Sequence, residues 1–164
     1  MRAAPASIID AVATYRPEDD PLFRVLIGVR ELPMRVLSSR PRPRQFGMED
    51  FTLLARTEDA IVFGLAGAFW KSDFGLHRFA DGTAFQNLQT PGIAKLILGF
   101  SVIPGAEGSN RLATETRVFC LDHAARRRFT PYWYLIRPVS GLIRRRILSS
   151  VKKSAEPRSV RELA

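Results

Sequence analysis

The stretch from residue 129 to residue 151 constrains the fold most, because its apolar residues recur with the period of an α-helix. At 100° per residue, seven positions fall within about 40° of one line. They are Phe129, Trp133, Ile136, Ser140, Ile143, Ile147 and Val151. Tyr132, Leu135 and Val139 lie beside this line and widen the apolar face. Because most amphipathic helices of this kind are packed, we expect this helix to cover the rest of the domain.

Two starts of this helix are compatible with the sequence. Asp122 is a good N-cap for one long helix. Alternatively, Thr130 caps a helix whose first residue is Pro131, and residues 122–129 form a separate short turn. In either case Pro138 cannot donate a backbone hydrogen bond, so we expect a bend over residues 134–141.

Before this helix, the apolar pattern changes to the alternation of β-strands. We expect strands over residues 51–57, 60–69, 93–104 and 111–121. Gly64 and Gly67 in the second strand allow strong curvature or close approach of another segment. Residues 71–92 show no periodic pattern, and we expect them to be irregular up to a turn at Pro91-Gly92.

The beginning of the chain is expected to be helical. Residues 4–15 form the first predicted helix, with Pro5 near its start, and residues 21–37 form the second. An extended Pro/Arg loop is expected over residues 38–47. Two helices, a meander of strands and one long helix predict a single α+β domain over residues 1–156, with a frayed tail over 157–164.

The positive charge of the chain is concentrated at its C-terminal end. The formal net charge is +9, and residues 126–164 hold 11 basic and two acidic side chains, which gives 11 − 2 = +9. Residues 1–125 hold 14 of each sign and sum to zero. The charge is therefore a property of the long helix and its tail.

Several classes of protein are disfavoured by composition. One cysteine, Cys120, excludes an internal disulfide, and two distant histidines argue against a zinc site, so we expect no metal and no cofactor. Cys120 has apolar neighbours, which favour a buried thiol. The first residues lack the apolar core of a signal peptide, and the longest apolar run, residues 60–70, is too short to span a bilayer. We expect a soluble, cytoplasmic protein.

Three runs of sequence carry a resemblance to a known superfamily: "TPGIAKLILGFSV" (90–102), "RLATETRVFCLDHAARRRF" (111–129) and "YWYLIRPVSGLIRRRILSSVKKSAE" (132–156). Together with the order of elements, they resemble uncharacterised bacterial members of the START, polyketide-cyclase and pathogenesis-related (SRPBCC) superfamily. The resemblance implies the helix-grip fold, a curved antiparallel sheet wrapped around a long C-terminal helix. The superfamily opens with a strand before its first helix. Here we expect that strand to be missing, very short, or lost to an internal start codon.

The resemblance also implies an apolar cavity between sheet and helix that binds a hydrophobic small molecule or lipid. The side chains expected to line it lie on faces that should meet. They are Phe63, Phe69, Trp70, Leu98, Phe100, Thr116, Tyr132, Trp133, Ile136 and Ser140.

Two residues are candidates for a catalytic alternative, a cyclase or hydrolase on the same fold. Glu115 in "TETR" would act as an acid or base inside the cavity, whereas the reading that we favour is an exposed ion pair with Arg117. His77 is a candidate general base because of its residue type, but no carboxylate at a suitable spacing in the sequence supports this role, which favours a surface histidine. A binding protein without catalytic residues is the favoured interpretation.

A third hypothesis concerns the basic residues. Arg144, Arg145, Lys152 and Lys153 would attract an anionic membrane surface. Nucleic acid is disfavoured as a partner, because no aromatic residues alternate with these basic residues on an exposed face and no recognised nucleic-acid motif is present.

Overall fold

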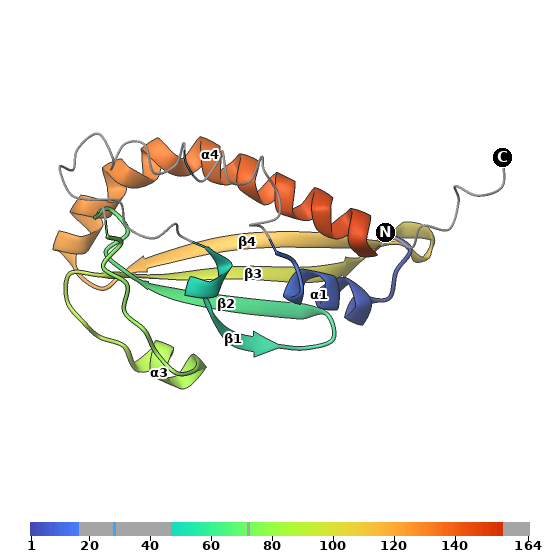
Figure 1. Ribbon diagram of the computed structural model, residues 1–164, viewed down its shortest axis with the longest axis horizontal. Helices are drawn as coiled ribbons and strands as arrows, with labels where there is room; N and C mark the ends of the chain where they lie inside the picture. The colour runs from blue at the N-terminus through green and yellow to red at the C-terminus, as the bar shows by residue number, and fades with distance from the viewer. Residues whose placement is uncertain (17–27, 29–46, 72, 156–164) are drawn as a thin grey trace.

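The computed structural model describes residues 1–16, 28, 47–71 and 73–155 as an α+β fold in which a long C-terminal helix lies across an antiparallel sheet (Figure 1). Its elements are α1 (Pro5–Ala13), η2 (Met48–Asp50), β1 (Thr52–Arg56), β2 (Ala60–Gly67), α3 (Gly82–Asn87), β3 (Ala94–Pro104), η3 (Ala106–Gly108), β4 (Asn110–Cys120) and α4 (His123–Ala155). The helix expected over 21–37, the loop over 38–47 and the tail over 157–164 lie outside the described residues, apart from Gly28 and Gly47.

The four strands form a curved meander in the order β1-β2-β3-β4, and each strand pairs antiparallel with its neighbour in the chain. This confirms the four strands expected from the alternating pattern. Met1 lies at the edge of β4, where its backbone exchanges two hydrogen bonds of 2.7 and 2.8 Å with Asn110.

The register of β3 and β4 separates two faces of the sheet. Leu98 pairs with Thr116 on the face toward α4, and the next pair, Gly99 and Glu115, belongs to the opposite face. On β3 the inner residues Leu96, Leu98, Phe100 and Val102 are buried. Alternation of side chains along a strand therefore decides which residues can meet the helix.

α4 begins directly after Asp122, whose Oδ1 accepts a hydrogen bond of 2.7 Å from the backbone N–H of Ala125. The helix continues through Pro131 to Ala155, so the alternative start at Pro131 is wrong. Of the residues on the predicted line, Phe129, Ile136, Ile143, Ile147 and Val151 are buried. Leu135, which was expected beside them, is 57% exposed, because its direction lies about 120° from Phe129.

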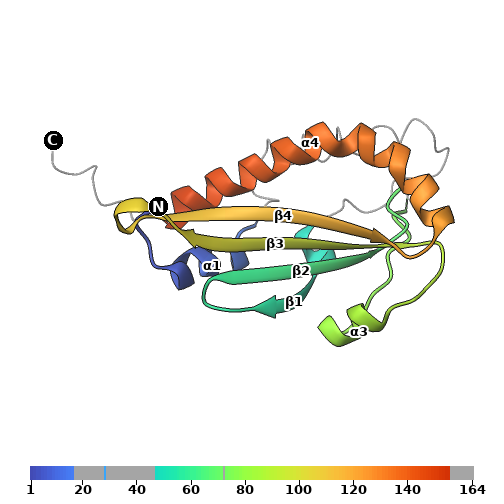
Figure 2. The ribbon, with the colours of Figure 1, turned by 180° about the vertical axis from the view of Figure 1, so that it is seen from behind.

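α4 is arched over the sheet, as both views of the ribbon show (Figures 1 and 2). Pro131 and Pro138 lie inside the helix, and both are exposed. A proline ring clashes with the carbonyl of the residue four positions earlier and opens the helix on its own side. Because Pro138 faces away from the sheet, a bend at this residue turns the two ends of the helix toward the sheet, in the sense of the arch.

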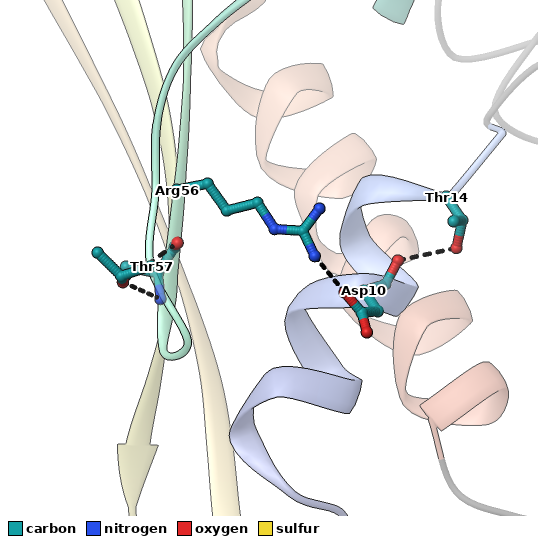
Figure 3. A network of polar contacts seen from close by, with 5 residues as sticks. Asp10, Thr14, Arg56 and Thr57 are labelled. Atoms are coloured by element: carbon teal, nitrogen blue, oxygen red, sulfur yellow. Dashed lines mark hydrogen bonds and ion pairs between the residues drawn. The ribbon is translucent and has the colours of Figure 1, made fainter.

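α1 closes one end of the space between the sheet and α4. Its residues Ile8 and Ile9 are fully buried, and the helix lies beside the C-terminal part of α4. Figure 3 shows the polar contact that joins α1 to β1, in which the Arg56 guanidinium donates a hydrogen bond to Asp10. This ion pair connects α1 to β1. Because both side chains are exposed, it contributes little to the free energy of unfolding.

α3 was not predicted, since residues 71–92 were expected to be irregular. The turn chemistry gives a local signal, because the Asp81 carboxylate accepts a hydrogen bond of 2.8 Å from the Ala84 N–H and so caps the helix. Lys95, from the outer face of the sheet, donates to the Gln86 and Leu88 carbonyls and ties α3 down. At Gly67, a Cβ would lie 2.7 Å from the Phe74 carbonyl oxygen, which confirms the expected close approach of another segment.

Candidate functional site

A pocket of about 90 Å³ lies between the inner face of the sheet and the arched part of α4. Its lining is mainly apolar. The lining residues are Gly47, Met48, Phe51, Phe69, Leu96, Leu98, Thr116, Phe129, Tyr132, Trp133, Ile136, Ser140, Ile143, Arg144 and Ile147. The pocket therefore has the sheet as its floor, α4 as its roof, and η2 with the residues beside it as one wall.

The arch of α4 explains why this space is not filled. α1 packs against the sheet and against α4 and supplies Ile8, Ile9 and Val12 to the core, and none of these residues lines the pocket. The side chain of Ser140 is short. At this position the side chains of α4 and of the sheet therefore do not fill the space between the two elements. A bent rod over a curved sheet leaves such a gap, because dense packing requires matching surfaces.

Aromatic rings surround Phe129 at the N-terminal end of the pocket. The ring of Phe129 stacks on Trp133 at 5.8 Å and meets Tyr132 at 5.9 Å, both measured between ring centroids. Trp70 approaches Phe129 edge-on at 6.4 Å. The indole N–H of Trp70 is buried and has no acceptor among the described residues. Such a group is satisfied by water or by a ligand.

Arg144 is the cation of the pocket lining. It lies about 60° around α4 from Phe129, whereas its neighbour Arg145 lies about 160° away and is exposed. Arg144 is half-buried and makes no ion pair with any described residue. A guanidinium in this position can bind a carboxylate or phosphate at the edge of an apolar site.

Seven of the ten residues expected to line a cavity do line this pocket: Phe69, Leu98, Thr116, Tyr132, Trp133, Ile136 and Ser140. The other three, Phe63, Trp70 and Phe100, lie elsewhere. Phe100 is buried in the core farther along β3, and Phe63 and Trp70 pack against that core. Trp70 lies in the turn after β2, outside any helix or strand.

Eight lining residues were not among the ten expected from the sequence: Gly47, Met48, Phe51, Leu96, Phe129, Ile143, Arg144 and Ile147. Gly47 was assigned to a loop without a packing pattern, and Arg144 was assigned to the charged outer side of the helix. For Arg144 a signal was present, because an angle of about 60° from the apolar line places it on the flank of the buried face. For Gly47 and Met48 no local pattern indicates contact with a helix almost a hundred residues later.

Neither catalytic candidate lies in the pocket. Glu115 is on the outer face of β4, with its side chain 64% exposed, and it accepts hydrogen bonds of 2.7 and 3.1 Å from Arg117. This hydrogen bonding lowers the pKa of the Glu115 carboxyl. His77 is exposed, and its backbone N–H donates to the Ala66 carbonyl. Neither residue is therefore placed to act as an acid or base on a ligand in the pocket.

Other site classes receive no support within the described part of the chain. No group of three potential metal ligands occurs among these residues. Burial raises the pKa of the Cys120 thiol, which disfavours a reactive thiolate. Among the same residues, no helix is both long and apolar enough to cross a bilayer.

A search of protein-family models, of curated proteins and of solved structures finds no match to this chain. The geometry of the pocket is therefore the basis for assigning a function.

Proposed function

We propose that this protein binds a small apolar molecule that carries an acidic group, such as a fatty acid, in the pocket between the sheet and α4. The observation that carries the proposal is a mainly apolar pocket with one half-buried cation, Arg144, in its lining. The apolar body would lie against Leu96, Leu98 and Ile136. The acidic group would meet the Arg144 guanidinium, because a charge-assisted hydrogen bond there compensates for its removal from water.

The size of the pocket limits the ligand. Sites for drug-sized molecules occupy roughly 300–1,000 Å³, whereas this pocket has about 90 Å³. It accepts a small apolar group or one part of an acyl chain. A longer lipid requires α4 to move away from the sheet, and the opened helix at Pro138 is the place where such movement costs least.

The proposed architecture is the helix-grip fold, and the proposed class is a ligand-binding member of the START, polyketide-cyclase and pathogenesis-related superfamily. The four-stranded curved sheet, the long C-terminal helix and the pocket between them support this assignment. Because folds of this kind serve several functions, the ligand is argued from the pocket and not from the fold.

The test is calorimetric titration with octanoic acid and with octanol, which share a chain and differ in the acidic group. We expect the wild-type protein to bind the acid more tightly. Arg144→Gln should weaken binding of the acid by roughly 10- to 100-fold, as for a hydrogen bond to a charged group, and leave binding of the alcohol unchanged.

Arg145→Gln is the matched control, because it removes the same charge one residue later on the exposed side of α4. It should leave the affinity for both compounds unchanged. If neither compound binds, and solvent extraction of the purified protein releases no apolar molecule for mass spectrometry, the proposal is wrong. Equal losses in the two arginine variants would contradict the role of Arg144.

A further inference from the structure

The outer face of α4 combines exposed apolar residues with basic residues. We define this face by the ten exposed side chains of residues 127–153 that lie within about 60° of the line opposite Phe129. They are Arg127, Pro131, Tyr134, Leu135, Pro138, Leu142, Arg145, Ser149, Lys152 and Lys153. Its centre is apolar and spans about 16 Å along the helix. Its two ends are basic.

The central residues of this face include three large exposed side chains. Tyr134 is 68%, Leu135 57% and Leu142 51% exposed, and all three belong to the same stretch of one helix. Contiguous exposed apolar side chains with a polar rim mark an interaction surface. The convex side of the arched α4 faces away from the sheet (Figure 1), and the exposed Pro138 belongs to the same stretch.

The charge of α4 has one sign. Its 33 residues contain nine Lys or Arg side chains and no Asp or Glu, which equals the formal net charge of the whole chain, +9. No described residue forms an ion pair with Arg127, Arg145, Lys152 or Lys153. This face therefore favours an anionic partner over a neutral or basic one.

We infer that the outer face of α4 docks on an anionic lipid bilayer, with the helix lying parallel to the surface. In this arrangement Leu135 and Leu142 enter the boundary between headgroups and acyl chains, and Tyr134 lies at the headgroup level, where tyrosine is enriched. Arg127, Arg145 and Lys152 contact lipid phosphates. A bilayer is the partner that offers phosphates and an apolar layer side by side.

Two other partners fit this face less well. Nucleic acid would match the charge but would leave Leu135 and Leu142 exposed to water. A second copy of the chain would cover the apolar residues but would bring two uncompensated basic helices together, which costs free energy.

The inference is tested by sedimentation of the full chain with vesicles of phosphatidylcholine and phosphatidylglycerol in equal amounts, and with vesicles of phosphatidylcholine alone. We expect binding to the mixed vesicles, weaker binding as NaCl is added, and little binding to the neutral ones. The double variant Arg145→Gln/Lys152→Gln should bind about 30-fold more weakly, since each basic residue near such a surface contributes about fivefold. Leu135→Ser/Leu142→Ser should lose at least roughly tenfold.

Two matched variants serve as controls, and circular dichroism checks that every variant is folded. Arg78→Gln removes an exposed positive charge from a loop outside α4 and outside the pocket, and Phe119→Ser removes a 65% exposed apolar side chain from the other side of the sheet. Both should bind mixed vesicles as the wild type does. Equal binding to neutral vesicles, or wild-type binding by Leu135→Ser/Leu142→Ser, overturns the inference. Tighter binding to an oligonucleotide, or a dimer that is lost with the two leucines, also overturns it.

Discussion

The carboxylate of Asp122 joins two parts of the chain at the start of α4. One oxygen accepts from the Ala125 N–H, and the other accepts from the Gly92 N–H in the turn before β3. Gly92 has a φ of +78°, a conformation that favours glycine, so its N–H is directed by the turn itself. These backbone donors, Ala125 first, lower the pKa of Asp122 below its ordinary value of 3.8.

Asp122→Asn should lower the melting temperature at neutral pH, because the amide has one acceptor oxygen, so it loses one of these two hydrogen bonds and accepts the other without a negative charge. The folded-state pKa of Asp122 is depressed. The stabilisation by its charge is therefore complete above the ordinary pKa and disappears as the pH falls through the folded value. The difference in melting temperature between wild type and variant should be constant from pH 5 to pH 7, roughly, and shrink below about pH 4.

Thermal scans monitored by circular dichroism across this pH range provide the measurement. Asp73→Asn is a control, since that exposed carboxylate accepts only a local hydrogen bond from Gly75. A difference between Asp122→Asn and wild type that does not change down to about pH 2 would show that the charge of Asp122 is not involved.

At the scale of elements, Pro138 is the residue that best explains the arch of α4, because it lies at the middle of the helix on the side away from the sheet, whereas Pro131 lies in the first third. An exposed proline inside a helix leaves the carbonyl of Tyr134 without its intrahelical partner and keeps the two halves of the helix at an angle. The arch in turn holds the middle of α4 away from Leu98 and Thr116, where the pocket lies. A single residue thus connects helix geometry with the presence of a binding site.

Pro138→Ala should restore one backbone hydrogen bond and straighten α4. We expect the free energy of unfolding to rise by about 2 kcal/mol, which is the difference in helix propensity less the loss of a rigid residue from the unfolded chain. Affinity for octanoic acid should fall as the middle of the helix settles on the sheet. Urea denaturation and calorimetry measure the two effects, and a loss of stability would show that packing, not Pro138, imposes the bend.

The elements of this fold could be predicted from periodic patterns, whereas the site could be predicted only in part. The alternating apolar pattern of residues 93–104 correctly predicts β3, and the helical spacing of residues 129–151 correctly predicts α4. Both patterns are strong because one face of each element is buried. α3 was missed since its six residues are too few to show a period. The position of the pocket along α4 depends on long-range contacts with Met48 and Phe51, which no local pattern encodes.

At the scale of the whole molecule, the pocket is a place where packing is incomplete. Every unfilled volume in a core forgoes dispersion contacts, so a binding cavity lowers stability relative to a filled one. The short side chain of Ser140, in the centre of the roof, maintains that volume.

Ser140→Leu should fill the pocket. We expect a gain of about 1 kcal/mol in the free energy of unfolding, as for other cavity-filling substitutions, together with loss of octanoic acid binding. Ser149→Leu is the matched control on the exposed side of the same helix, and it should change neither quantity. Chemical denaturation and calorimetric titration test the pair, and unchanged affinity in Ser140→Leu would place the ligand elsewhere.

The sequential order of the sheet has a consequence for synthesis on the ribosome. Each strand pairs with the strand made just before it, so the sheet can assemble as the chain emerges. The helix that covers its apolar face comes last and is 33 residues long. At common rates of translation, synthesis of α4 takes about 2 to 7 s, and during this time Leu96, Leu98 and Phe100 are not yet covered by the helix. During this interval the nascent chain is a natural client for chaperones that bind exposed apolar strands.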